Sequence, residues 1–210
     1  MHAERADYSP RRPQRQRQTL PTPTPDSALV IIDVQNDFCP GGSLAVTDGD
    51  AVIPVINAYA EAFAAAGCLV VADRDWHPEV TTHFVAYGGA WPPHCIQGTP
   101  GAEYHPGLRF PAGTVHIRKG MGAHEDAYSG FEGRDDQGTL LDALLKQHGV
   151  TTIYVGGLAT DYCVRATVLD GLKAGYKVVV IGDACRAVNI QPTDGANALS
   201  EMAAAGATLA

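Results

Sequence analysis

Apolar and polar positions along the chain fall into blocks that predict strands separated by helices. Short apolar runs predict strands over residues 28–34, 68–72, 114–118, 152–155, 177–181 and, as a short sixth strand, 207–209. Apolar residues at helical spacing predict helices over residues 50–66, 139–148, 161–174 and 193–205. Strands that alternate with helices favour right-handed crossovers. We therefore expect a three-layer α/β/α fold, with an open parallel sheet of five or six strands and helices on both faces.

Residues 1–27 lack this pattern. They are rich in Pro, Arg and Gln and hold almost nothing apolar, so we expect a disordered or extended tail. Its five Arg against three acidic residues leave a charge of +2, and the alternative is a basic arm that touches an anionic surface. Residues 28–210 are then expected to form one domain, which is long enough to fold without disulfides or metals.

Charge and cysteine usage narrow the class of protein. The net charge of -8 leaves -10 for residues 28–210 once the +2 of the tail is taken away, and an acidic body is a poor nucleic-acid binder. The five cysteines are odd in number and form no C-x-x-C pair, which predicts reduced thiols. The apolar runs are far shorter than the roughly 20 residues of a membrane span. We expect a cytoplasmic protein that binds a small-molecule substrate and neither a membrane nor nucleic acid. A homo-oligomer is possible.

Reactive side chains follow the predicted strands. Ligands of open parallel sheets bind beyond the carboxyl ends of the strands, and Asp33, Asp75, Lys119 and Cys163 lie at or just beyond such ends. The long loop 85–113 contains aromatic residues, which favours a functional loop over a disordered one. The chain has neither G-x-G-x-x-G after a strand nor G-x-x-x-x-G-K-[ST], so no phosphate cradle is predicted.

The stretch 155–167, V-G-G-L-A-T-D-Y-C-V-R-A-T, predicts a strand, a glycine turn and a helix with Cys163 in its first turn. A helix N-terminus favours the thiolate form of a cysteine. The backbone N–H groups of Ala159 and Cys163 could hold a developing oxyanion. The alternative is that Cys163 only packs in the core, which is common for a lone cysteine.

Amide hydrolysis through a covalent intermediate requires a nucleophile, a base and a cation, and these groups are present in Cys163, Asp33 and Lys119. Asp33 can accept and return a proton, Lys119 can stabilise a thiolate, and Cys163 can attack the carbonyl carbon. Taken singly, Asp33 could be a cap or a buried partner, and Lys119 a surface lysine. Only the three together predict a catalytic site.

A second set of residues has the spacing of metal ligands. Asp75, His77 and His83 form the pattern D-x-H-x₅-H, and His94 follows in the loop. Side chains two apart at a strand end can point the same way, and three protein ligands with open positions are typical of a catalytic metal. Mixed oxygen and nitrogen ligands suit Zn²⁺, Fe²⁺ or Mn²⁺ alike. The other five histidines are assigned to the surface or to packing.

Several motifs, taken in order, resemble those of the nicotinamidase/pyrazinamidase family, within the isochorismatase-like cysteine hydrolases. They are V-I-I-D-V-Q-N-D-F-C-P-G-G-S-L-A-V, D-x-H-P-x₄-H-F, W-P-P-H-C, K-G before A-Y-S-G-F, and G-L-A-T-D-Y-C-V-R-A-T. The resemblance covers the chain from residue 28 to the C-terminus. The family lacks a tail like residues 1–27, and the loop between Lys119 and Tyr128 departs from its pattern.

The resemblance implies hydrolysis of nicotinamide, and of pyrazinamide, to the acid and ammonia through a thioester, a step of NAD salvage. It implies one divalent metal ion, with zinc favoured and iron or manganese as alternatives. It also implies a cis peptide bond before Ala159 that directs the oxyanion-hole amides. The implied sites are the catalytic Asp33, Lys119 and Cys163; the oxyanion hole of Ala159 and Cys163; the metal ligands Asp75, His77 and His83, with His94 a ligand in some members; and the pocket residues Phe38, Trp91 and Tyr128.

Two rival functions remain open from the sequence. The first is another amidase of the same superfamily, acting on carbamoyl or ureido amides, but such enzymes generally lack the D-x-H-x₅-H pattern. The second is a non-catalytic protein that binds a metal or a pyridine, which would not need the combination of Lys119 and Cys163.

Overall fold

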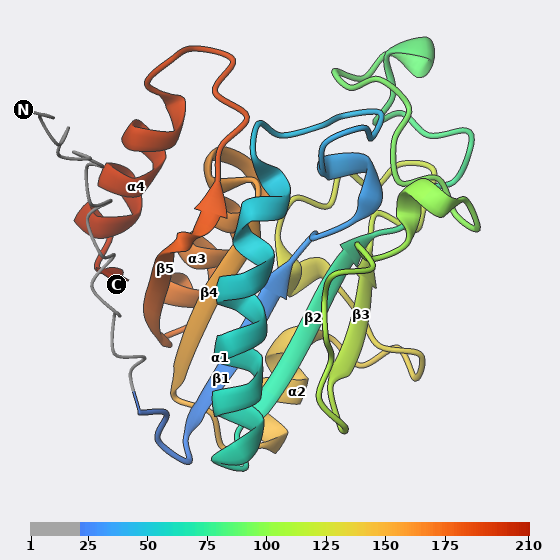
Figure 1. Cartoon of the computed structure of the whole chain (residues 1–210). Coiled ribbons are helices and arrows are strands. Elements are labelled where there is room, and N and C mark those ends of the chain that lie inside the picture. Colours follow the sequence, from blue (N-terminus) through green and yellow to red (C-terminus); the bar gives the residue numbers. More distant parts are fainter. Residues whose placement is uncertain (1–21) are drawn as a thin grey trace, which may run out of the picture.

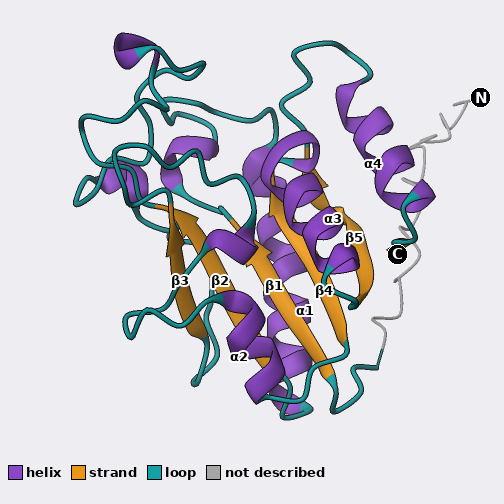
Figure 2. Cartoon of the chain, turned by 180° about the vertical axis from the view of Figure 1, so that it is seen from behind, coloured by secondary structure: helices purple, strands orange, loops and turns teal. Residues whose placement is uncertain are grey.

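The computed structural model describes residues 22–210, which form a six-stranded, all-parallel sheet between layers of helices (Figures 1 and 2). The strands lie in the order β3-β2-β1-β4-β5-β6. They are β1 Ser27–Ile32, β2 Leu69–Asp75, β3 Val115–Lys119, β4 Thr152–Leu158, β5 Lys177–Arg186 and β6 Thr208–Leu209. The α-helices are α1 Ile53–Ala65, α2 Leu141–Gln147, α3 Arg165–Lys173 and α4 Asp194–Ala204. The predicted fold class is confirmed, and the short sixth strand is present.

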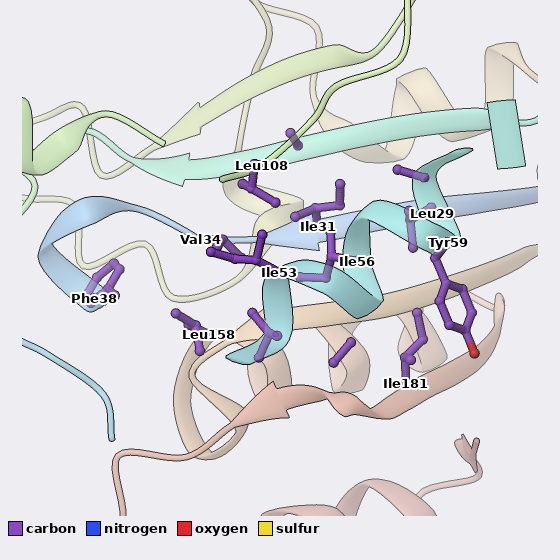
Figure 3. Close-up of a cluster of buried hydrophobic side chains, with 14 of the residues drawn as sticks. Leu29, Ile31, Val34, Phe38, Ile53, Ile56, Tyr59, Leu108, Leu158 and Ile181 are labelled. Carbon is purple, nitrogen blue, oxygen red and sulfur yellow. The ribbon is translucent and has the colours of Figure 1, made fainter. Parts of the chain in front are cut away.

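The helices cover both faces of the sheet. On one face α1 packs against Leu29 and Ile31 of β1, and its residues Ile53 and Ile56 point into this cluster (Figure 3). On the other face α2, α3 and α4 form a second buried cluster with alternate residues of β1, β4 and β5 (Figure 2). Since successive side chains of a strand point to opposite faces, a strand buried on both is a continuous apolar run. This is why the run S-A-L-V-I-I forms the central strand.

Several strands and helices end at different residues from those predicted. β1 stops at Ile32, before the predicted residue 34, because Asp33 takes a left-handed backbone conformation with φ 48°. β2, β4 and β5 continue to Asp75, Leu158 and Arg186, beyond their predicted ends. The ladders there are held by backbone hydrogen bonds that do not depend on apolar side chains. The single helix predicted over 161–174 is instead a π-helical turn, Thr160–Val164, followed by α3.

The strand order reverses between β1 and β4. From β1 the chain builds outward through β2 and β3 on one side, and through β4, β5 and β6 on the other. A crevice forms at the carboxyl ends of the strands at such a switch point. β1 and β4 lie very close there: at Gly157, with φ 133°, an added Cβ would be 2.0 Å from the carbonyl oxygen of Ile32. Glycine is therefore required at this position.

The predicted tail lies mainly outside the described residues, since the structure describes none of residues 1–21. Its last part contacts the domain: the backbone N–H of Thr151 donates a hydrogen bond to the carbonyl of Asp26 at 2.8 Å. Within residues 22–210, no helix combines the length and the hydropathy needed to cross a membrane.

Candidate active site

The ammonium group of Lys119 is the centre of a buried charge cluster. Its Nζ donates hydrogen bonds to both carboxylate oxygens of Asp33, at 3.0 and 2.8 Å, and to Oδ1 of Asp75. The same Nζ lies 3.9 Å from Sγ of Cys163. Lys119 is 1% exposed and Asp33 0%, so the interpretation of Lys119 as a surface lysine is wrong. The structure thus brings together the three residues that the sequence proposed from separate strand ends.

The strands themselves place these side chains. In the parallel ladder of β2 and β3, Asp75 is the partner of Lys119, and each is the last residue of its strand. Asp33 directly follows β1, which lies between β2 and β4. Cys163 follows β4 after one turn. Four consecutive strands in the sheet therefore direct one polar side chain each to a common point.

Gln35 is a site residue that the sequence analysis missed. Its side-chain Nε2 donates to the carbonyl of Asp75 at 2.8 Å and to that of Ala102 at 2.9 Å. Its Oε1 accepts a hydrogen bond from the backbone N–H of Asp75 at 2.9 Å. Just beyond the end of β1, the buried amide thus bonds to both backbone groups of Asp75 and holds that residue in place. Its position two residues after Asp33 was the only available signal.

Asp73 was also missed. It is 0% exposed, its Oδ2 lies 3.8 Å from Nζ of Lys119, and neither of its oxygens has a hydrogen-bond partner among the described residues. Burial raises the pKa of Asp73 well above its usual value. The spacing D-x-D of Asp73 and Asp75 was a signal, because residues two apart in a strand share a face. The ammonium group therefore faces three carboxyl groups.

Burial and charge set the protonation of the cluster. Burial raises the pKa of Asp33 to about 6. Burial would also raise the pKa of Asp75, but the attraction of Lys119 and the contact with His77 outweigh it and hold this pKa well below its usual range. Burial lowers the pKa of Lys119, but Asp33 and Asp75 reverse the effect, so it stays charged. At neutral pH the cluster thus contains a stable ammonium group and an ionised Asp33.

The protonation state of Cys163 differs from the thiolate that the sequence predicted. Burial raises its pKa well above the usual value; Lys119 opposes this, while Asp33 and Asp75 add to it. The position before a helix therefore does not yield a resting thiolate, because loss of water and two nearby carboxylates outweigh it. Cys163 lines the pocket, so it is not sealed inside the core as the packing interpretation supposed. A neighbouring base has to take its proton.

The turn before Cys163 has the backbone that the resemblance implied. The bond between Leu158 and Ala159 is cis. The N–H of Val164 donates to the carbonyl of Ala159 at 3.1 Å, which closes the π-helical turn. Ala159 and Cys163 both line the same pocket. The two residues expected to supply oxyanion-hole amides therefore lie on either side of one turn.

Three histidines converge beside this cluster. One ring nitrogen each from His77, His83 and His94 can be chosen so that all lie within 4.8 Å of one another. Oδ2 of Asp75 lies 3.6 Å from Nε2 of His77 and 3.9 Å from Nε2 of His94. Nε2 of His77 is buried without a hydrogen-bond partner among the described residues. An orphaned nitrogen of this kind, among imidazoles and a carboxylate, fits a divalent metal ion.

The rings are oriented by oxygen atoms on their outer side. Nδ1 of His77 lies 3.1 Å from the carbonyl of Gly120, and Nδ1 of His94 lies 2.8 Å from that of Pro92. Nδ1 of His83 lies 3.3 Å from Oδ1 of Asp126. An N–H donated outward leaves Nε2 with its lone pair facing inward, as metal ligation requires. Burial also lowers the pKa of His83, and that of His94 to about 4, which keeps both rings neutral.

The pocket above both clusters has an aromatic wall. Nε1 of Trp91 donates to the hydroxyl of Tyr128 at 2.8 Å, and the ring of Trp91 packs edge-on against Tyr162 at 4.8 Å. Tyr162 was missed, although it precedes Cys163 in the sequence. All three predicted pocket residues line the cavity together with the nucleophile candidate. The lining residues are Phe38, Leu44, Val46, Asp75, His83, Trp91, His94, Asp126, Ala127, Tyr128, Leu158, Ala159, Tyr162, Cys163 and Val188.

Comparisons with known proteins identify the family of the chain. The family described as "Isochorismatase domain" matches residues 27–210. The nicotinamidase of Escherichia coli is 45% identical, over 88% of this chain and 94% of its own. The nicotinamidase/pyrazinamidase of Mycobacterium tuberculosis is 46% identical, over 87% of this chain and 97% of its own. The crystal structure of the pyrazinamidase of Pyrococcus horikoshii in complex with zinc has a TM-score of 0.81 and 44% identity, over 88% of this chain and 98% of that one.

The fold and the match over nearly all described residues define the class of protein. The chain belongs to the isochorismatase family. Its relatives at 45–46% identity are nicotinamidases, so within the family it groups with the amidohydrolases.

Proposed function

We propose that this chain is a metal-dependent nicotinamidase that also hydrolyses pyrazinamide, and so acts in NAD salvage. The observation that carries the proposal is the position of Cys163. Its sulfur lies 3.9 Å from the ammonium of Lys119, in a pocket whose walls also hold the aromatic residues and the rings of His83 and His94. The nucleophile thus adjoins the buried cluster of Asp33 and Lys119 and faces a cavity with room for a flat heteroaromatic ring.

In the first half of the reaction Asp33 accepts the proton of Cys163, and the sulfur attacks the carboxamide carbon. The C–S bond forms as the C=O electrons move to oxygen, where the N–H groups of Ala159 and Cys163 stabilise the negative charge. The C–N bond then breaks, and Asp33 returns the proton to nitrogen, so that ammonia leaves. A pKa of about 6 at Asp33 suits a group that has to accept and release a proton near neutral pH.

The second half hydrolyses the thioester. Asp33 accepts a proton from water, the resulting hydroxide adds to the acyl carbon, and the C–S bond breaks to give nicotinic acid, which loses its proton to solvent and leaves as nicotinate. The sulfur then recovers its proton from Asp33. Lys119 stays protonated throughout, since it is held by Asp33 and Asp75. Its role is to stabilise the thiolate and to keep Asp33 oriented.

Asp75, His77, His83 and His94 would hold the metal ion. Zinc is the first expectation, with iron and manganese as alternatives. When bound, a divalent ion supplies a Lewis-acid contact for the nitrogen of a pyridine or pyrazine ring. Phe38, Trp91 and Tyr128 hold the ring on its faces and edges. Among residues 22–210, no Lys or Arg lines the cavity, which favours a neutral amide over a carboxylate-bearing one.

The alternative is an amidase for carbamoyl or ureido substrates. Metal analysis of the pure protein, combined with ammonia release from nicotinamide, pyrazinamide and an N-carbamoyl amino acid, separates the two. We expect turnover of both aromatic amides, its loss on treatment with a chelator and its return with a divalent metal. Turnover of the N-carbamoyl compound alone would refute the proposal, and no turnover of any amide would favour the non-catalytic binder.

The proposal includes a cytoplasmic location and association into a homo-oligomer. All five cysteines are free thiols, as expected in a reducing compartment. Light scattering on the full chain measures the oligomeric state.

A further inference from the structure

We propose that Asp126 is a positioning residue for the metal centre: its carboxylate holds His83 with Nε2 directed at the ligand cluster. The proposal rests on the proposed function only in taking the three histidines as metal ligands. Its observation is the contact of 3.3 Å between Oδ1 of Asp126 and Nδ1 of His83.

The three histidines are not held in the same way. His77 and His94 donate to backbone carbonyls, of Gly120 and Pro92, which no substitution can remove. His83 is held by a side chain, and that side chain is 71% exposed while the ring itself is 4% exposed. His83 is therefore the ligand whose orientation depends on the identity of one surface residue.

The loop that carries Asp126 is fastened to the ligand loop at further points. The N–H of Thr82 donates to the carbonyl of Ala123 at 2.9 Å, and Nε2 of Gln97 donates to that of Met121 at 3.2 Å. The first bond joins the residue before His83 to the loop of Asp126 and so brings Asp126 beside the ring of His83. The packing of the two loops thus places residue 126 beside His83, and the carboxylate of Asp126 supplies the acceptor for Nδ1.

Asp126 acts on the tautomer as well as on the position of the ring. With an acceptor at Nδ1, the imidazole hydrogen stays on Nδ1 and the lone pair of Nε2 faces His77 and His94. Without it, the hydrogen can move to Nε2, and the ring can rotate away from the cluster. Loss of such an outer partner typically weakens metal binding by about 10-fold to 100-fold.

The test is the zinc affinity of the full-length protein, measured without substrate by competition with a chromogenic chelator. Asp126→Ala removes the acceptor. Asp126→Asn removes the charge but keeps an oxygen that can accept from Nδ1. Glu79→Gln removes one charge from an exposed acidic residue of the ligand loop and serves as the control. Circular dichroism and thermal unfolding of the metal-free proteins check that all variants fold alike.

We expect zinc affinity to fall about 10-fold or more in Asp126→Ala, to recover largely in Asp126→Asn and to be unchanged in Glu79→Gln. Equal losses in both Asp126 variants would mean that the charge alone attracts the cation, and would overturn the proposal. So would an unchanged affinity in Asp126→Ala, or a wild-type chain that binds no zinc. A wild-type chain that binds zinc but releases no ammonia from nicotinamide would refute the proposed function instead.

Discussion

The carboxylate of Asp75 and the ammonium group of Lys119 are hydrogen-bonded inside the protein, between the paired last residues of β2 and β3. The other oxygen of Asp75 lies 3.6 Å from Nε2 of His77. One carboxylate therefore belongs to both the thiol cluster and the histidine cluster. A substitution at Lys119 is therefore expected to alter the metal ligands, and a substitution at His77 is expected to alter the environment of Cys163.

Replacing Lys119 by Ala should destabilise the protein strongly. The variant leaves Asp33, Asp73 and Asp75 buried without their cation, and breaking a buried ion pair in this way costs about 3–5 kcal/mol. These carboxyl groups would then bind protons more readily in the folded state than in the unfolded state, so stability should rise as the pH falls. Urea unfolding at pH 8 and pH 5 measures both effects.

Lys146→Ala is the matched control, because Lys146 pairs with Asp142 at 2.6 Å on the exposed surface of α2. An exposed pair of this kind contributes less than about 1 kcal/mol. If both lysine variants lost the same free energy of unfolding at pH 8, the central role given to Lys119 would be incorrect.

Replacing Cys163 by Ala should abolish ammonia release from nicotinamide, by at least about a thousandfold in kcat, because no other group can form the thioester. Mass spectrometry should detect an acyl adduct in the wild type during turnover and none in the variant. Cys68→Ala is the control: Cys68 immediately precedes β2, at the opposite end of the sheet, and its sulfur donates to the carbonyl of Thr24. Activity retained by Cys163→Ala would exclude the covalent mechanism.

The activity should depend on the ionisation of Asp33. Burial raises its pKa to about 6, and only the ionised carboxylate can accept the proton of Cys163. Below this pH Asp33 is protonated, so kcat/KM for nicotinamide should fall as the pH decreases from 7 to 5 and level off above pH 7. A profile that is flat between pH 5 and pH 7 would show that another group is the base.

Replacing Gln35 by Ala should lower both stability and metal affinity. The variant leaves the N–H and C=O of Asp75 without their buried partner, and each lost hydrogen bond of this kind costs about 1–3 kcal/mol. We expect a loss of about 2–4 kcal/mol in urea unfolding together with weaker zinc binding. Asn197→Ala is the control, since the side-chain amide of Asn197 donates to Oγ1 of Thr193 on the exposed surface of α4. Equal effects of the two substitutions would contradict the conclusion that Gln35 holds the backbone of Asp75 in place.

Much of the site could be predicted because each residue has a local signal. Asp33, Lys119 and Cys163 follow apolar runs, and the topology of a parallel sheet brings strand ends together. The histidines have a ligand spacing, and the motifs matched a known family. Gln35, Asp73 and Asp126 had no comparable signal, because their roles depend on partners 40 or more residues away.

The periodicity of the chain by itself determined the alternation of strands and helices, the parallel sheet and the edge at which the reactive groups gather. Only the tertiary structure decided which atoms face each other there: that Lys119 lies among three carboxyl groups, and that Cys163 is a buried thiol with a raised pKa. The reason is that the pattern of apolar and polar side chains indicates only which face of each strand or helix is buried. Protonation and hydrogen bonding depend on distances of a few ångströms between segments remote in sequence, which only packing of the whole chain sets.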